Sequence, residues 1–375
     1  MIKYTARDYI QMYRHTALGV DLITWLRILS TYRFRIGVFF IPKVLFITGM
    51  AILNLPFQLF EYFLYKRKVK AVKVKQPIFI LGHPRSGTTF LFYLLSRDQR
   101  FGYCNVTNAL TPNLMFTAEG ALRKLLDRAL PDTRPQDNVK VSSGKPKEEE
   151  FAMANLGIAS IICGFYFPKK LRETFDRFAL FTKNKSDKTT WQRDFYYVTQ
   201  KLTLKKGGKQ LILKSPYNTA RLKEILEIFP DALFIHIHRD PYTVYNSTVK
   251  LFEKVLPILS LHKVDQEHIH DYVMYSYRQM HEKFLKDKKA LPESRLVEFG
   301  YDEFTRDPID KLRTVYQRLG ISGFEDAKMH IQDELNSFEN YQTNKYADIT
   351  EETRAEINRE WAFFFDAYNY PINSA

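Results

Sequence analysis

Residues 81–90, LGHPRSGTTF, have the glycine spacing of a phosphate-binding loop. Gly82 and Gly87 stand as in the loop of nucleotide triphosphatases, where a lysine after the second glycine reaches the outer phosphates. Here Thr88 occupies the lysine position. The loop is therefore expected to bind an anion, and the missing lysine favours a metal-free phosphate anhydride over a nucleoside triphosphate.

Side chains of the same loop supply further donors. Arg85 carries a forked cation that binds phosphate or sulfate oxygens in pairs. Hydroxyl groups follow at Ser86, Thr88 and Thr89. The apolar run 77–82 indicates a buried parallel strand, and residues 88–98 continue as an amphipathic helix. Such a strand–loop–helix unit directs backbone amides and the positive end of the helix at one anion.

A second set of candidate ligands follows two further predicted strands. Lys214 lies near the end of the run 210–216, and Arg239 comes directly after the apolar run 232–238. Because the carboxyl ends of parallel strands meet at one edge of a sheet, binding sites gather there. Ser247 stands eight residues after Arg239, so a cation at the strand end and a hydroxyl on the next helix can bind one phosphate together.

Three consecutive glutamates are the favoured candidates for a general base. Glu148, Glu149 and Glu150 lead into the apolar residues 151–152, and burial there would raise a carboxyl pKa toward neutrality. The same acids are equally typical of the first turn of a helix, where the helix dipole stabilises them. Histidines are rivals for the role, although those on an apolar strand are more typical of a core: His83, His236 and His238.

Together these segments resemble the sulfotransferase family that uses 3'-phosphoadenosine 5'-phosphosulfate (PAPS). HPRSGTTF is similar to its 5'-phosphosulfate loop, LKSP to its strand-end lysine motif, and HRDPYTVYNST to its 3'-phosphate site. Arginine in the loop and the segment GKPKEEEFAMANLG are similar to the bacterial and tyrosylprotein-like branch. Asn218 departs from the pattern, because relatives often carry a histidine near the strand-end lysine. The resemblance extends from residue 77 to the end of the chain.

The resemblance implies an enzyme that transfers the sulfuryl group of PAPS to an acceptor hydroxyl without a metal. Such transfer needs cations on the developing charge and a base for the hydroxyl proton. Arg85 and Lys214 are the candidates for stabilising the sulfuryl and bridging oxygens, and Glu148 or Glu150 for the base. The residues expected to bind the donor are Arg85, Ser86, Gly87, Thr88, Thr89, Arg239 and Ser247.

The elements that position these residues predict an α/β fold, with a doubly wound parallel sheet of the phosphate-loop type flanked by helices. Residues 1–75 are expected to form a helical, hydrophobic and basic arm, and residues 76–375 the sulfotransferase domain. In the arm, residues 44–60 carry no charge. The length of this stretch, seventeen residues, is at the lower limit for spanning a bilayer, and Pro56 interrupts it. Basic residues follow within 65–75, which suits an anionic membrane surface. The alternative is an arm packed on the domain.

The net charge and the cysteine content indicate the class of partner and the cellular compartment. The net charge of +14 implies an anionic partner. Nucleic acid is disfavoured, because the basic residues gather beside an apolar run and not among exposed stacking aromatics. Two cysteines form neither a disulfide framework nor a zinc pattern. A cytoplasmic protein is therefore expected, with attachment to the inner face of the membrane through the N-terminal segment as an option.

The acceptor is expected to be a hydrophobic alcohol such as a sterol or lipid, because the chain has 30 phenylalanines, 23 tyrosines and an apolar arm. Residues 158–167 and 252–262 are candidate walls for an apolar pocket. A carbohydrate hydroxyl or a tyrosine phenol is the alternative, since a fold does not fix its acceptor. From other classes, a nucleotide kinase or an inactive membrane-associated nucleotide-binding protein would also explain the loop.

Overall fold

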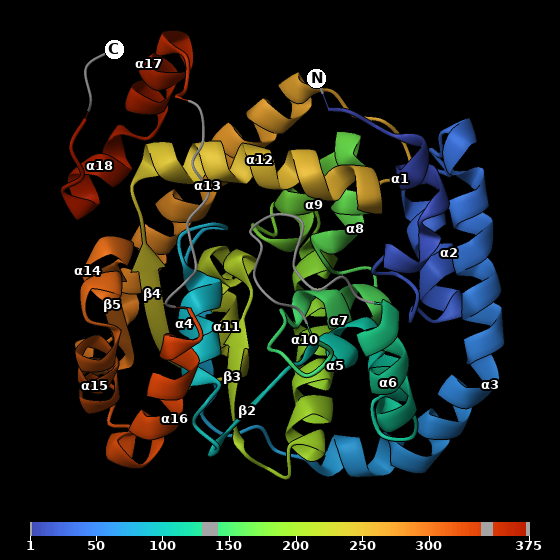
Figure 1. Ribbon diagram of the computed structural model, residues 1–375, viewed down its shortest axis with the longest axis horizontal. Helices are drawn as coiled ribbons and strands as arrows, with labels where there is room; N and C mark the ends of the chain where they lie inside the picture. The colour runs from blue at the N-terminus through green and yellow to red at the C-terminus, as the bar shows by residue number, and fades with distance from the viewer. Residues whose placement is uncertain (1, 130–141, 339–347, 373–375) are drawn as a thin grey trace.

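A five-stranded parallel sheet forms the centre of the computed structural model, which describes residues 2–129, 142–338 and 348–372 (Figure 1). The strands lie in the order β2-β3-β1-β4-β5. Their bounds are β1 Ile78–Leu81, β2 Phe101–Tyr103, β3 Gln210–Lys214, β4 Leu233–His238 and β5 Leu296–Gly300. β1, which leads into the glycine-bounded loop, is central and pairs in parallel with both β3 and β4. The predicted α/β class and parallel sheet are confirmed.

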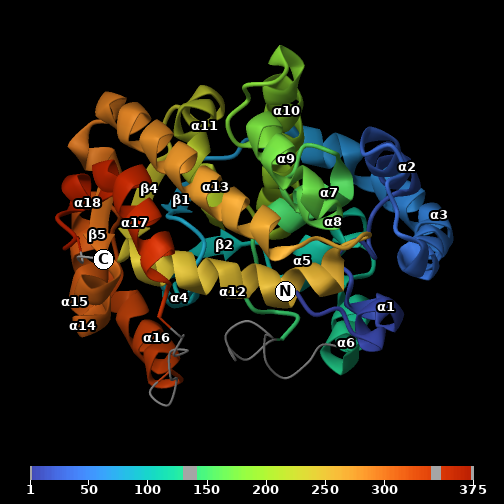
Figure 2. The same ribbon diagram turned by 90° about the horizontal axis from the view of Figure 1, so that it is seen from above.

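Helices cover both faces of the sheet. Alternate residues of β1 point to opposite sides, and both sets are apolar, so each face has to pack against other elements. Ile78 and Ile80 pack in one hydrophobic cluster with α4 (Thr88–Leu95), α15 (Pro308–Arg318) and α16 (Phe324–Asn336). Phe79 and Leu81 pack in a larger cluster with α10 (Lys185–Lys205), α11 (Leu222–Ile228) and α13 (Gln266–Asp287). Figure 2 shows the two groups of helices on opposite sides of the strands.

The remaining helices extend these layers and connect the strands. They are α5 Val106–Leu110, α6 Glu119–Ala129, α7 Glu150–Leu156, α8 Ile162–Tyr166, α9 Leu171–Phe178, α12 Pro241–Leu259, α14 Tyr301–Arg306, α17 Glu351–Glu360 and α18 Ala362–Tyr368. The segment GKPKEEEF therefore ends at the start of α7. α12 follows β4 directly, so it begins at the same edge of the sheet as α4.

The N-terminal residues pack against the larger cluster. α1 (Ala6–Ile10), α2 (Leu22–Thr31) and α3 (Ile41–Ala71) lie along one side of the molecule (Figure 1). Trp25 and Ile28 of α2, together with Ile47 of α3, are fully buried in the cluster that also holds α7 to α13. In the described ranges, α3 with the turn before it is the one helix long and apolar enough to cross a membrane by length and composition. One face of the arm thus packs on the rest of the chain.

Candidate active site

The loop between β1 and α4 depends on backbone conformations that favour glycine. Gly82 and Gly87 have φ of 140° and 102°. A Cβ at Gly82 would lie 2.4 Å from the carbonyl oxygen of Ile237, and one at Gly87 would lie 2.4 Å from the ring of Tyr301. Arg85 also adopts a positive φ, 74°, and strain of this kind at a residue other than glycine is typical of functional sites.

The hydroxyl residues of the loop lie at the start of α4. Ser86 and Thr88 are buried, and Thr89 is half-buried. The Ser86 hydroxyl donates to the carbonyl of His83 at 2.9 Å, and the amide of Gly82 donates to Thr219 Oγ1 at 2.8 Å. The first amides of a helix have no partner within the helix, so those of α4 are suited to an anion.

Arg85 and Ser247, which are 162 residues apart in the sequence, are in direct contact. Arg85 Nε donates to Ser247 Oγ at 2.9 Å, and Ser247 is buried on α12. Arg239 lies at the end of β4, with its guanidinium 4.1 Å from the ring centre of Tyr301. Tyr301 therefore lies next to both Arg239 and Gly87. This position of Tyr301 between Arg239 and Gly87 was not predicted from the sequence.

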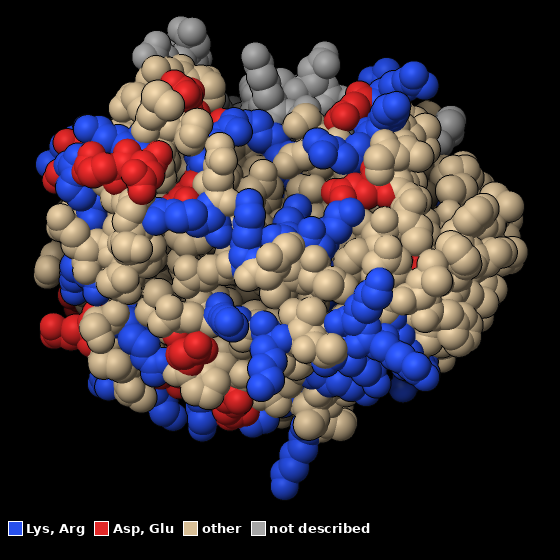
Figure 3. All heavy atoms as spheres, turned by 90° about the horizontal axis from the view of Figure 1, so that it is seen from below, with Lys and Arg blue, Asp and Glu red and all other residues tan. Residues whose placement is uncertain are grey.

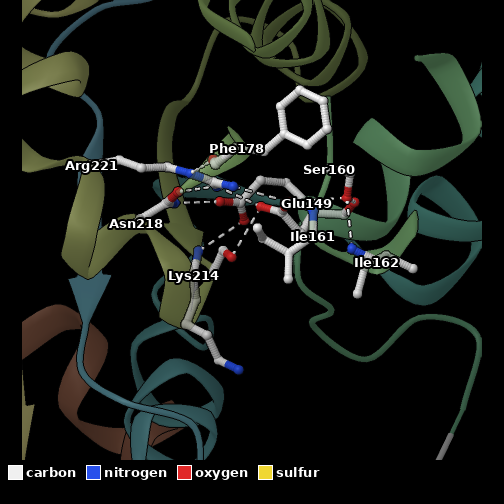
Figure 4. Close-up of polar contacts among 10 residues, drawn as sticks. Glu149, Ser160, Ile161, Ile162, Phe178, Lys214, Asn218 and Arg221 are labelled. Carbon is white, nitrogen blue, oxygen red and sulfur yellow. Dashed lines mark hydrogen bonds and ion pairs between the residues drawn. The ribbon is translucent and has the colours of Figure 1, made fainter. Parts of the chain in front are cut away.

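The three glutamates before α7 have three different environments. Glu148 accepts a hydrogen bond from Lys214 Nζ at 2.6 Å, and 24% of its side chain is exposed. Glu149 is fully buried and accepts from the Lys214 amide at 3.0 Å and from Asn218 Nδ2 at 2.8 Å. Figure 4 shows the side chain of Lys214 running away from Glu149. Burial raises the pKa of Glu149 to about 7, because the charged form loses its hydration.

Glu150 is bound inside the protein by a buried arginine. Arg221 donates to its two carboxylate oxygens at 2.7 and 3.2 Å, and Ser160 Oγ and the Ile161 amide donate at 3.0 and 2.9 Å. Arg221 is itself fully buried and donates to the carbonyl of Phe178 at 2.7 Å (Figure 4). The pair fixes the start of α7 against the turn after β3. Breaking such a buried pair destabilises a protein strongly.

A mainly apolar cavity of about 300 Å³ lies beside the loop. Pro84 of the loop and Glu148 are both in its wall. The predicted segment 158–167 contributes Ile162 and Phe165, and the predicted segment 252–262 contributes Val255, Ile258 and Leu259. The arm supplies another part of the wall, with residues between 13 and 18. This part was missed, because its sequence carries only a helix-like apolar pattern that suits a core equally well.

Comparison with known proteins identifies the family. Residues 77–326 match the sulfotransferase family. The chain belongs to the sulfotransferase family. It is 29% identical over 354 residues to the omega-hydroxy-beta-dihydromenaquinone-9 sulfotransferase Stf3 of Mycobacterium bovis, a match that covers 94% of this chain and 90% of that protein.

Two crystal structures of mycobacterial sulfotransferases share the fold. STF9 from Mycobacterium avium superposes with a TM-score of 0.66 at 20% identity, over 85% of this chain and 83% of that one. STF1 from Mycobacterium tuberculosis H37Rv has a TM-score of 0.63 at 15% identity, over 96% and 99%. The predicted family and enzyme class are confirmed. The sulfotransferase uses a sulfuryl donor and a hydroxyl acceptor, so neither a kinase nor an inactive binding protein is needed to explain the loop.

Of the three candidate histidines of this sulfotransferase, His83 and His236 are buried and His238 is half-buried. Burial lowers the pKa of His83 and that of His238 to about 3. His238 Nδ1 lies 2.8 Å from the Tyr370 hydroxyl, and the fully buried His236 lies 3.0 Å from Glu298. Among the residues described, no group of three or more acids, histidines or cysteines is arranged to hold a metal ion, and both cysteines are buried and unpaired with each other.

Proposed function

We propose that this sulfotransferase transfers the sulfuryl group of PAPS to the hydroxyl of a hydrophobic, lipid-like alcohol. One observation carries the proposal: Pro84 of the anion-binding loop and Glu148 lie in the wall of the same apolar cavity. An apolar acceptor in this cavity has the loop on one side and a carboxylate on another. The relative that acts on a menaquinone derivative supports an acceptor of this class.

The residues present fit a sulfated nucleotide. The glycine cradle, the first amides of α4 and the hydroxyls of Ser86, Thr88 and Thr89 suit the 5'-phosphosulfate, together with Arg85. Arg239 and Ser247 suit the 3'-phosphate, and the Arg85–Ser247 hydrogen bond joins the two groups of ligands. PAPS supplies an activated sulfuryl group; all further chemistry falls to side chains of this chain.

We assign the role of general base to Glu148. Of the three glutamates it is the one that lines the cavity, and its carboxylate is held by the strand-end cation Lys214. As the acceptor oxygen bonds to sulfur and the bond from sulfur to the bridging oxygen breaks, the hydroxyl proton passes to Glu148. A protonated Glu148 holds Lys214 less strongly, which frees the ammonium to stabilise the departing oxygen.

Glu149 and Glu150 are positioning residues in this scheme. Glu149 ties the segment before α7 to the backbone of Lys214, so it sets the distance between base and cation. Glu150 was predicted as an alternative base, but both of its oxygens accept hydrogen bonds from buried donors, above all Arg221. A proton acceptor has to reach the substrate hydroxyl, and Glu148 lies at the cavity wall that such a hydroxyl would contact.

Transfer of ³⁵S from labelled PAPS to acceptors of graded polarity tests the function. The panel is a long-chain primary alcohol, a sterol, a terminally hydroxylated polyprenyl quinone, glucose and free tyrosine. We expect label on the apolar alcohols and none on glucose. In parallel, calorimetric titration should give tight, metal-independent binding of adenosine 3',5'-bisphosphate and weak binding of ATP. Bisphosphate binding with transfer to glucose alone would overturn the acceptor class, whereas magnesium-dependent ATP binding without bisphosphate binding would overturn the donor.

A further inference from the structure

α3 carries buried polar side chains on the face that packs against the protein. Lys43 is fully buried, and its ammonium donates to the carbonyl oxygens of Ile258 at 2.9 Å and Ser260 at 3.3 Å. Glu61, eighteen residues later, is also fully buried and accepts three backbone amides of residues 115–117. Its carboxylate also pairs with the buried Lys201 at 3.2 Å. Polar contacts thus hold both halves of the helix to the protein.

Two amides strengthen this attachment between the charged residues. Asn54 donates to the carbonyl of Leu18 at 3.2 Å, and Gln58 donates to the carbonyl of Gly19 at 3.3 Å. The inward face of α3 therefore carries two buried charges and a buried amide among apolar residues such as Val44, Ile47 and Ala51. An ordinary surface helix of a water-soluble protein keeps its charged residues on the outward face.

The outward face of α3 is apolar over most of its length. Leu45, Leu53 and Phe63 are 65%, 66% and 74% exposed, and Ile52, Phe57 and Phe60 are exposed with them. Figure 3 shows a broad area without charged side chains on the side of the molecule formed by α2 and α3. Water-soluble monomers rarely expose a continuous apolar area of this extent, so the face is suited to an apolar partner.

The charges carried by α2, α3 and the residues that join and follow them are almost all positive. Between residues 22 and 75 the chain has ten Lys and Arg residues and one acid, the internally paired Glu61. Arg27, Arg33 and Arg35 precede α3, and exposed basic residues follow its apolar part at positions 67, 68 and 70. A second copy of this chain would bring basic ends against basic ends in either orientation. An anionic lipid surface is complementary to both the apolar face and the charges.

We propose that α3 attaches this sulfotransferase to an anionic lipid bilayer by lying in the plane of the interface, with its outward apolar face inserted. Lys43 and Glu61 are about 27 Å apart along the helix axis, and both are held by the protein. α3 cannot span the bilayer in this state, because a spanning helix would draw the attached protein and these buried charges into the hydrocarbon.

The attachment connects with the acceptor cavity. Leu18, whose carbonyl accepts from Asn54 of α3, is also a wall residue of the cavity. Residues 13–19 therefore supply both wall residues of the cavity and carbonyl acceptors for the amides of α3. If the proposed acceptor class is correct, α3 brings the cavity close to the phase in which a lipid alcohol dissolves. The attachment itself does not depend on that acceptor.

Vesicle co-sedimentation of the full chain tests the attachment without any activity assay. Wild type should pellet with phosphatidylglycerol–phosphatidylcholine vesicles. The double variant Leu45→Asp/Phe63→Asp should bind at least about tenfold more weakly, because both carboxylates would enter the interface. Leu125→Asp/Met329→Asp is the matched control, since those side chains are 61% and 66% exposed elsewhere, and it should bind like wild type. Equal loss in both double variants, or no binding by wild type, would overturn the proposal.

The depth of α3 distinguishes in-plane attachment from spanning. Single variants Leu45→Cys, Ile52→Cys and Phe63→Cys can be labelled with an environment-sensitive dye, because the native Cys104 and Cys163 are buried. Lipids brominated at different depths should quench all three dyes at the same shallow level. A depth that increases along the helix would overturn the in-plane arrangement. Dyes unaffected by vesicles, together with a dimer at sedimentation equilibrium, would assign the face to a second copy.

Discussion

The two sides of the active site are built in different ways. The proposed donor side consists of one short loop, Gly82 to Thr89, together with Arg239 directly after β4 and Ser247 on α12. The acceptor side is a cavity whose wall comes from the arm, the segment before α7, α8 and α12. Binding a phosphate requires particular amides and cations at fixed spacing, whereas lining an apolar cavity requires only shape. The donor side therefore leaves a motif in the sequence, and the acceptor side does not.

Lys214 and Glu148 connect the two sides, because the lysine ends a strand of the donor edge and the glutamate lines the cavity. Replacing Glu148 with Gln should have the largest effect on turnover. We expect kcat/KM to fall by roughly 10² to 10⁴, the usual contribution of a general base, with the Kd of adenosine 3',5'-bisphosphate within about twofold of wild type. Steady-state kinetics and calorimetry measure the two quantities.

Glu150→Gln is the control for that variant. It weakens the buried pair with Arg221, so its cost should appear as a lower free energy of unfolding in urea, of about 3 kcal/mol or more. The folded fraction should keep most of its turnover. If Glu150→Gln instead loses turnover at unchanged stability and Glu148→Gln remains active, Glu150 is the base.

Glu149 joins the acceptor-side segment to the donor-side strand, and its effect should depend on pH. Burial raises its pKa from the ordinary 4.5 to about 7, so the folded protein binds this proton more tightly than the unfolded chain does. Protonated Glu149 therefore contributes its full stabilisation of the folded state below about pH 4.5. As pH rises from there toward 7, the free energy of unfolding should fall by up to about 3 kcal/mol on account of this group. Urea unfolding of Glu149→Gln between pH 5 and 8 should lack this part of the decline. If the free energy of unfolding falls with pH equally in the variant and in wild type, Glu149 is not the source of the decline.

The same contrast explains how far the sequence predicts this molecule. The parallel sheet follows from short apolar runs with helical segments between them, and β1, β3 and β4 lie where those runs predicted them. Arg85, Arg239 and Ser247 could be named because their spacing from strand ends is local. The contact between Arg85 and Ser247 was not itself predicted, although it agrees with the general rule that strand ends share one edge.

The sequence could not show that the three consecutive glutamates, Glu148, Glu149 and Glu150, have different environments. They depend on Arg221 and Asn218, which lie about 70 residues away and approach only when α7 packs beside the end of β3. The polar contacts on the inward face of α3 could not be predicted from the sequence either. Its apolar outward residues give the same sequence signal whether a helix spans, lies on or avoids a membrane.

Arg239→Ala tests the donor side alone. The Kd of adenosine 3',5'-bisphosphate should rise by about 10- to 100-fold, the usual cost of losing hydrogen bonds to a charged group. Arg239→Lys should recover only part of the affinity, because a lysine cannot make a paired contact with phosphate oxygens. Arg306 is exposed on α14, so Arg306→Ala serves as the control and should bind the bisphosphate like wild type. Unchanged affinity in Arg239→Ala would remove Arg239 from the donor site.

Graded substitution of Val255 tests the acceptor side alone and should have the smallest effect. Val255 lies on α12 in the cavity wall, eight residues beyond Ser247, the proposed donor ligand on the same helix. Val255→Ile and Val255→Trp should raise the KM of apolar alcohols in that order, by up to about tenfold, because each takes up part of a cavity of about 300 Å³. The Kd of the bisphosphate should not change, since Val255 lies more than two helical turns from Ser247. A parallel change in both constants would mean that α12 moves as one body, and that the two sides of the site share more than the Lys214–Glu148 contact.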